Sequence, residues 1–238
     1  MNRETNTAYF RSDAAGIAQL AAEVAHEIRN PLTVVQGFVR MLKRGADPHC
    51  LDMMESELSR IEALVEDFLQ LTRPAVPRKD RIQGEKLIRE TVGLFIGRAQ
   101  AQGVALKVRP LPPGLWFEGN EPRVKQVLMN VLKNALEAMP HGGTIELEGS
   151  LCRGEDERDG EPNAGGWVRI AVYDEGEGLT DEQLARAEEP FFTTKAQGTG
   201  LGLAVCRRIM AEHAGRLMIG RRPGGGAQVF LFFPKKGS

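Results

Sequence analysis

Residues 14 to about 44 constrain the fold most, because their apolar side chains recur at spacings of three and four. Such spacing predicts one long helix with a single face packed against other helices. His26 is expected off that face, about 200° from the apolar positions two residues away, with Asn30 one turn later on its side. Pro31 removes the N–H that the Glu27 carbonyl would accept, so a bend is predicted. Taken alone, His26 is interpreted most simply as a solvated surface residue.

A break at residues 45–48 separates this helix from a second one, which is expected to end at Leu71 before the linker. A lone two-helix hairpin has too little core to be stable, so two copies are predicted to form a four-helix bundle. The alternative is that the hairpin packs on its own second domain. The apolar row of the second helix consists of Leu51, Met54, Leu58, Ile61, Val65 and Phe68.

Further helices are predicted at 84–102, 121–139 and 200–214, and strands at 104–108, 144–150, 167–173, 215–220 and 227–233. Asn130 and Asn134 lie one turn apart on the second of these helices, and Lys133 and Glu137 flank the same polar stripe. Amide oxygens are suitable ligands for Mg²⁺, whereas an ordinary polar helix face is the alternative.

An apolar run ends at Asp174, which Gly176 and Gly178 follow. A carboxylate at a strand end can accept a hydrogen bond from an amine such as that of adenine, and glycines allow close approach of a ring. Many ordinary turns share this pattern. Residues 190–195 (PFFTTK) then precede 198–203 (GTGLGL), which lead into a helix. Free N–H groups at a helix N-terminus favour phosphate. Neither the dinucleotide fingerprint nor the GxxxxGK[ST] loop fits these residues.

In this order, the motifs resemble those of bacterial sensor histidine kinases. They are HEIRNP from His26 (H box), Asn130 to Asn134 (N box), DEGEG from Asp174 (G1 box), PFFTTK from Pro190 (F box) and GTGLGL from Gly198 (G2 box). The stretches HEIRNPLTVVQGF and NALEAMPHGGTI are most similar to those of the sporulation kinases of spore-forming bacteria. Three features depart from the family pattern. Glu137 stands where many relatives carry lysine, Gly226-Ala-Gln-Val-Phe replaces Gly-Thr-Thr-Phe-Thr, and the 152–166 loop is long and polar.

The resemblance implies an α+β protein in which a two-helix hairpin forms a dimeric four-helix bundle and a GHKL-type α/β sandwich binds ATP. The expected parts are a tail or truncated linker at 1–13, the dimerisation and histidine-phosphotransfer hairpin at 14–75, a linker at 76–83 and the catalytic ATP-binding domain at 84–236. The charged 152–166 loop is expected to be a solvated hairpin tip, and residues 180–199 a lid over ATP.

The implied activity is autophosphorylation of His26 by ATP, followed by transfer to an aspartate of a response-regulator receiver domain. Glu27 would accept the imidazole proton, Asn30 would position water for a phosphatase reaction, and Asn134 and Asn130 would hold Mg²⁺. The implied nucleotide-binding residues are Asn130, Lys133, Asn134, Asp174, Gly176, Gly178, Phe191, Thr194, Lys195, Gly198, Thr199, Gly200, Leu201 and Gly202. A degenerate kinase scaffold and another GHKL ATPase are the alternatives.

The implied partners are a second copy of the chain, a receiver domain and a small inhibitory protein that binds the hairpin. With 31 basic and 32 acidic residues, the net charge of −1 gives no indication of nucleic-acid binding. No signal peptide or apolar run of ~18 residues is found, so a cytoplasmic core is expected, tethered to a membrane only through a sensor region outside this chain. Three scattered cysteines without a CxxC pair agree with a reducing compartment.

Overall fold

The computed structural model describes residues 14–43, 49–73, 80–152, 166–187, 189–195 and 198–235. Helices α2 (Ala14–Leu42) and α3 (His49–Thr72) form one compact unit together with Glu189–Val205. The elements between Ala75 and Glu188 and from Cys206 onward form the other. The tail expected at 1–13, the helix break at 45–48 and all of the expected hairpin tip except its two end residues lie outside the described residues.

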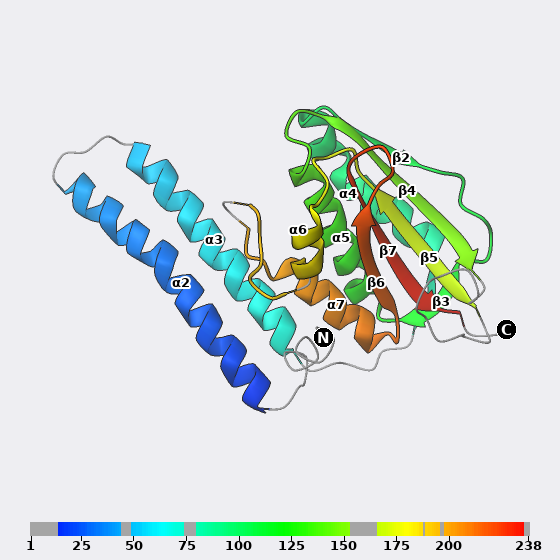
Figure 1. Cartoon of the computed structure of the whole chain (residues 1–238), viewed down its shortest axis with the longest axis horizontal. Helices are drawn as coiled ribbons and strands as arrows, with labels where there is room; N and C mark the ends of the chain where they lie inside the picture. The colour runs from blue at the N-terminus through cyan, green and yellow to red at the C-terminus, as the bar shows by residue number, and fades with distance from the viewer. Residues whose placement is uncertain are drawn as a thin grey trace. The chain divides into compact units, whose positions relative to one another are not determined.

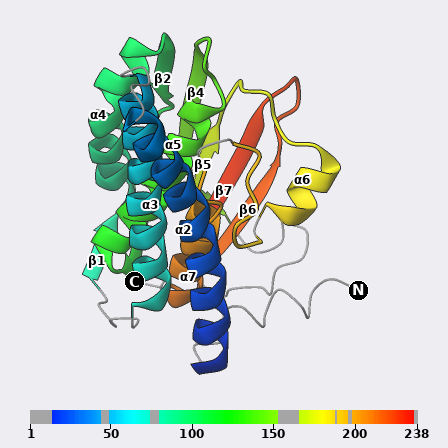
Figure 2. The same cartoon turned by 90° about the vertical axis from the view of Figure 1, so that its left-hand side faces the viewer.

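The first unit contains the predicted helical hairpin, in which α2 and α3 run antiparallel and side by side (Figures 1 and 2). Helix α2 continues through Pro31, which is buried, and ends two residues before its predicted end. None of the described helices is long and apolar enough to cross a membrane.

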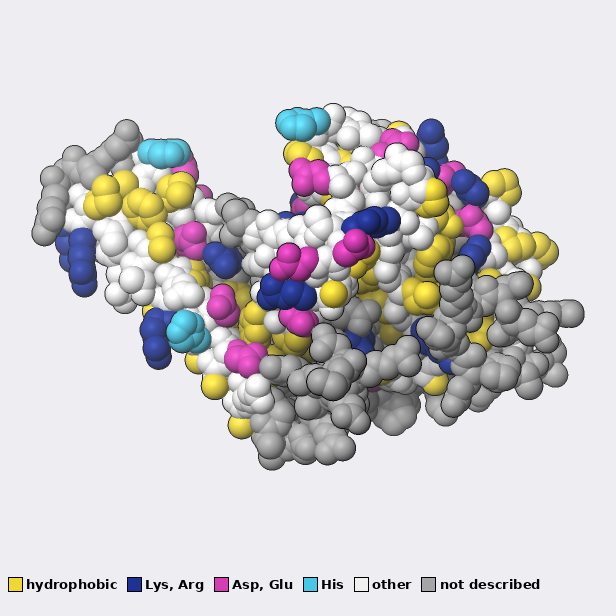
Figure 3. Space-filling view, viewed as in Figure 1, with side chains coloured by type: hydrophobic (Ala, Val, Ile, Leu, Met, Phe, Trp, Pro, Cys, Tyr) yellow, Lys and Arg dark blue, Asp and Glu magenta, His cyan; other side chains and the backbone are white. Residues whose placement is uncertain are grey.

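The two hairpin helices bury a different apolar row from the one predicted for α3. Cys50, Leu64 and Leu71 are the buried residues of α3, whereas Leu51 and Leu58 of the predicted row are about half exposed. Figure 3 shows hydrophobic side chains gathered on the hairpin surface near the α2–α3 connection. The exposed large apolar side chains of the hairpin are Leu32, Val34, Met41, Leu51, Met53, Leu58, Val65 and Leu69.

The second unit is built on a five-stranded mixed sheet. Its strands are β2 (Val104–Val108), β4 (Gly143–Cys152), β5 (Trp167–Tyr173), β6 (Arg216–Arg221) and β7 (Ala227–Pro234), in the order β2-β4-β5-β7-β6. Only the β2–β4 pair is parallel. Along most of β4, buried side chains alternate with half-buried ones, which is the pattern of a sheet covered on one face. In contrast, β5 and β7 each contain three consecutive buried residues.

Three helices cover that buried face: α4 (Gly84–Ala101), α5 (Glu121–Glu137) and α7 (Gly202–Glu212) (Figure 1). Asn120 caps α5, because its side-chain oxygen accepts a hydrogen bond from Arg123 N at 3.3 Å. His213 ties the end of α7 to this cap, since Nδ1 bonds the Ile209 carbonyl at 2.7 Å and Nε2 accepts from Asn120 N at 2.9 Å. Seven apolar residues of α5 are buried: Val124, Val127, Leu128, Val131, Leu132, Ala135 and Leu136.

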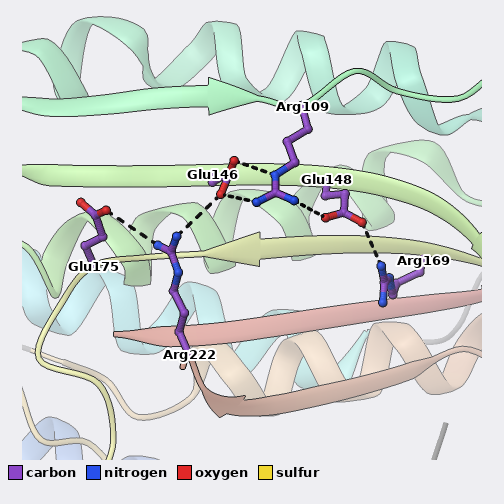
Figure 4. Close-up of polar contacts among 6 residues, drawn as sticks. All are labelled: Arg109, Glu146, Glu148, Arg169, Glu175 and Arg222. Atoms are coloured by element: carbon purple, nitrogen blue, oxygen red, sulfur yellow. Dashed lines mark hydrogen bonds and ion pairs between the residues drawn. The ribbon is translucent and has the colours of Figure 1, made fainter. Parts of the chain in front are cut away.

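The other face of the sheet carries charged and aromatic side chains. Arg109 holds Glu146 through two hydrogen bonds, Nε to Oε1 at 2.6 Å and Nη2 to Oε2 at 3.0 Å (Figure 4). Arg169 pairs with Glu148 at 2.9 Å on the same face. Arg216 stacks on Trp167 with its guanidinium carbon 4.9 Å from the ring centre. Outside this sheet, Arg81 stacks on Trp116 in the same way, at 4.7 Å.

Most predicted elements are present, and the predicted α+β class with helices on one face of a mixed sheet is confirmed. Three short elements were not predicted: β1 (Asp80–Gln83), β3 (Trp116–Gly119) and α6 (Asp181–Arg186). Strands β1 and β3 form a separate two-stranded antiparallel sheet. Strand β1 lies in the segment expected as linker, and α6 lies in the expected lid.

Candidate functional site

Helix α5 places Asn130 and Asn134 one turn apart on its half-buried side, opposite the apolar face that packs on the sheet. Lys133 is exposed, and its Nζ is 4.0 Å from Glu137 Oε1. Glu137, which departs from the lysine that the family resemblance gives for many relatives, is therefore half of an i, i+4 ion pair. Two amide oxygens on one partly buried stripe fit the oxygen preference of Mg²⁺.

Asp174 follows β5 directly and is 6% exposed. Its Oδ1 accepts two backbone hydrogen bonds, from Gly176 N at 2.9 Å and from Ala227 N at 3.0 Å. Its own N–H donates to the Ala227 carbonyl at 3.0 Å. Because both side-chain bonds reach Oδ1, Oδ2 is left to accept a hydrogen bond from a ligand. A buried carboxylate held in this way can accept a hydrogen bond from one donor group of a ligand, in a fixed orientation.

The glycines after Asp174 pack closely against neighbouring backbone. A Cβ on Gly176 would lie 2.7 Å from Ala138 Cβ, so the loop abuts the chain just after α5. Gly178 has a φ of +72°, and its Cβ would lie 2.9 Å from the Gly226 carbonyl oxygen. Gly176 and Gly178 therefore join the Asp174 loop to α5 and to the β6–β7 turn, a packing role that the sequence did not reveal.

The glycine-rich segment belongs to the first compact unit and is closed by its own backbone. Phe191 has a φ of +63°, and its N–H donates to the Gly200 carbonyl at 3.1 Å. Gly200 has a φ of +68°, and a Cβ there would collide with the Phe191 backbone. The F-box and G2-box motifs are thus brought together. Gly202 is the first residue of α7, as expected for a phosphate-binding turn before a helix, although the helix begins two residues later than predicted.

The other residues of this segment differ in how accessible they are. Thr194 is exposed and Lys195 is half-buried. The Thr199 hydroxyl donates to Asp67 Oδ2 of α3 at 2.7 Å. The Leu201 side chain is fully buried, so only its backbone can contact a ligand. The Gly198 N–H donates to the Lys195 carbonyl at 3.1 Å.

The predicted catalytic residues lie together on α2. His26 and Asn30 are exposed, one helical turn apart, and Glu27 is half-buried. No hydrogen bond is found between the His26 ring and the Glu27 carboxylate within the described part of the chain. The exposed His26 is available to an external phosphoryl donor. In contrast, both ring nitrogens of His213 are engaged with backbone groups.

Two residues near Asp174 were missed. Ala227 acts through its backbone N–H, which the residue type does not reveal. Arg222 donates from Nη1 to the Asp174 carbonyl at 3.4 Å. The sequence drew attention to this turn only through the replacement of threonine at 227 and 228, and it did not indicate a role for either residue.

A mixed sheet covered by helices on one face, with a buried carboxylate at a strand end and an asparagine-bearing helix beside it, defines an ATPase domain of the GHKL type. Comparison with known families agrees. The family described as "Histidine kinase-, DNA gyrase B-, and HSP90-like ATPase" matches residues 119–237, and "His Kinase A (phospho-acceptor) domain" matches residues 17–75. The chain belongs to the histidine kinase family, as predicted, and membership of the ATPase family implies that it uses ATP.

Similar proteins include two from Bacillus subtilis (strain 168). Sporulation kinase A is 37% identical over 98% of this chain and 37% of its own length, and sporulation kinase E is 35% identical over 92% of this chain and 28% of its own. The chain thus spans about a third of the length of these relatives. Among solved structures, histidine kinase ThkA in complex with response regulator protein TrrA matches with a TM-score of 0.75 and 31% identity, over 95% of this chain and 64% of that one.

Proposed function

We propose that this chain transfers the γ-phosphoryl group of ATP to His26 and then to an aspartate of a response-regulator receiver domain. The observation that carries the proposal is an exposed histidine on a hairpin helix, in the same chain as a buried carboxylate suited to adenine. Sporulation signalling is the process we propose, on the similarity to two sporulation kinases.

The chemistry follows from the roles of these residues. An imidazole nitrogen of His26 attacks the γ-phosphorus, the bond to the β–γ bridging oxygen breaks, and ADP leaves. Glu27 takes the proton from the other ring nitrogen. Asp174 accepts a hydrogen bond from the exocyclic amine of adenine, while Lys195 and the backbone of residues 198–202 neutralise the phosphate charge. Asn130 and Asn134 would hold Mg²⁺, which neutralises phosphate charge when bound.

A phosphatase activity and a homodimer belong to the same proposal. Asn30 positions water against the aspartyl phosphate of the regulator, which gives phosphatase activity. The apolar side chains left exposed on α2 and α3 pack against a second copy of the hairpin, because a two-helix unit buries too little of its own surface.

The decisive experiment incubates the chain with ATP labelled at the γ-phosphate. Acid-labile, base-stable label on the protein is expected, and it should be lost in His26→Gln while binding of an ATP analogue is retained. His49→Gln and His141→Gln are matched controls and should label normally. Label that survives in His26→Gln would overturn the assignment. Nucleotide binding without any label in the unmodified chain would indicate a scaffold or a different ATPase.

A mixing experiment tests the dimer. The His26→Gln and Asn134→Asp variants, neither of which is expected to label by itself, are mixed and left to exchange subunits before labelled ATP is added. Recovered label on the His26-bearing chain requires a dimer in which ATP on one copy serves the partner. A monomeric mass in light scattering, together with full activity, would contradict the homodimer.

A further inference from the structure

Arg222 lies at the start of the turn between β6 and β7 and reaches the loop that carries Asp174. Its Nη1 donates to the Asp174 carbonyl at 3.4 Å and is 4.0 Å from Glu175 Oε1. Its Nη2 is 3.7 Å from Glu146 Oε2 (Figure 4). The guanidinium carbon is 5.8 Å from the centre of the Tyr173 ring. One side chain therefore contacts three consecutive residues, from the end of β5 into the loop.

The turn itself holds Arg222 in place. The Arg222 N–H donates to the Gly226 carbonyl at 3.1 Å, and the Gly225 N–H donates to the Arg222 carbonyl at 3.1 Å. The Arg222 side chain is 25% exposed, and Glu146, which Arg109 also holds, anchors it from the sheet. The hydrogen-bonded turn and Glu146 therefore hold the guanidinium group at the loop. Because the side chain is already restricted, little further conformational entropy is lost when it bonds the Asp174 carbonyl.

Ala227 and Arg222 hold different atoms of Asp174. Ala227 fixes the Asp174 N–H and Oδ1 from one side. Arg222 fixes the Asp174 carbonyl, and thereby the orientation of the peptide that leads to Gly176, whose N–H is the second donor to Oδ1. The direction of Oδ2 depends on both donors remaining in place.

We propose that Arg222 is a positioning residue for adenine recognition. It orients the Asp174 carboxylate through the backbone of the loop and does not contact the base itself. The inference rests on the proposed function, in which Asp174 Oδ2 accepts a hydrogen bond from the exocyclic amine of adenine. Loss of Arg222 then weakens the part of nucleotide binding that depends on this amine, and leaves the phosphate contacts unchanged.

The test compares two ligands in the full chain: a non-hydrolysable ATP analogue and the same analogue with purine in place of adenine, which lacks only the 6-amino group. In Arg222→Gln, the Kd for the adenine ligand should rise about twofold to tenfold, the range for one hydrogen bond. The Kd for the purine ligand should stay the same. The KM for ATP should rise in the same proportion, with kcat at saturating ATP retained. Arg222→Lys should recover part of the loss, because it keeps the charge beside Glu146 and Glu175.

Arg216→Gln is the matched control, because Arg216 begins β6, the strand that ends just before Arg222, and stacks on Trp167 instead. It should leave both Kd values unchanged. Equal weakening of both ligands in Arg222→Gln would show a general structural role and overturn the inference, as would unchanged binding of both. If the unmodified chain itself binds the two ligands equally, the adenine-reading role of Asp174 fails, which is a separate failure of the proposed function.

Discussion

The Ala227 N–H donates to Asp174 Oδ1 at 3.0 Å, although 53 residues separate the two in the chain. This contact bears on the departure from the family pattern at 226–230, where Ala227 and Gln228 replace two threonines. The hold on Asp174 comes from backbone, so it does not depend on the residue type at 227. Replacement of threonine therefore leaves the carboxylate fixed.

Asp174→Asn is expected to weaken ATP binding by about 1.5–3 kcal/mol, the scale for a hydrogen bond with a charged partner. Two backbone N–H groups will keep an oxygen at the Oδ1 position, so the new amide NH₂ will face the adenine amine as a second donor. Isothermal titration with an ATP analogue measures the loss.

Glu177→Gln is the control for that substitution, because Glu177 lies in the same loop and is exposed. It should leave the affinity unchanged. GTP should bind the unmodified chain poorly, since guanine presents a carbonyl where adenine presents an amine. Equal affinities for ATP and GTP would contradict adenine recognition by Asp174.

Gly226→Ala is expected to destabilise the protein and to lower ATP affinity. Gly226 has a φ of +89°, and a Cβ there would collide with the Asp174 carbonyl. Gly224→Ala provides a matched control, with a φ of +92° and open space around its Cβ. In the control, the free energy of unfolding should fall by only about 1–2 kcal/mol, the penalty for a side chain at positive φ, and ATP binding should be normal. Urea unfolding and analogue titration measure both effects, and equal losses in the two variants would rule out the close contact.

Asn30→Ala should leave autophosphorylation largely intact and slow dephosphorylation of the regulator. The substitution keeps His26 and Glu27 and removes only the exposed amide one turn away. Gln36→Ala, an exposed amide further along α2, should alter neither rate. If both rates fall together in Asn30→Ala, Asn30 supports the helix before Pro31 and has no separate catalytic role.

The Glu146–Arg109 pair is expected to make stability depend on pH. The hydrogen bond from Arg109 is the main cause that lowers the pKa of Glu146 below its ordinary value of 4.5, and burial opposes it. Because the folded-state pKa is depressed, this contribution to stability is present above pH 4.5 and is lost as pH falls through the folded pKa.

Arg109→Gln should therefore raise the pKa of Glu146 toward its ordinary value, as measured by carboxyl NMR titration. The stability gap between this variant and the unmodified chain should narrow well below pH 4.5. Arg89→Gln removes an exposed pair with Glu85 and should have little effect at any pH. A gap that stays constant with pH would show that Arg109 acts by packing alone.

The long periodic elements could be predicted from the sequence. The strand predicted at 104–108 is β2 residue for residue, and the helix predicted at 121–139 differs from α5 by two residues at its end. Strands β1 and β3 were missed because each has only four residues and neither sequence, DRIQ or WFEG, alternates between apolar and polar residues. They pair with each other across more than 30 residues of chain, which local patterns do not reveal. On α3, Leu64 is buried and its neighbour Val65 is exposed. Apolar spacing fixes a helix face only to within about 100°, which is one residue.

Site residues recognised by side-chain chemistry, such as His26, Asp174 and Asn134, could also be predicted. Ala227 could not, because its contribution is an N–H that every non-proline residue has. Likewise, the role of Gly176 and Gly178 in packing emerges only when the loop is seen against Ala138 and Gly226.

The chain has two tryptophans, Trp116 on β3 and Trp167 on β5, each beneath an arginine. Both belong to the nucleotide-binding unit, and neither hairpin helix contains one. Tryptophan fluorescence of the intact protein therefore reports unfolding of the second unit, and unwinding of the helical hairpin has to be followed by circular dichroism. A heating curve that differs between the two probes would separate the stabilities of the two halves without cutting the chain.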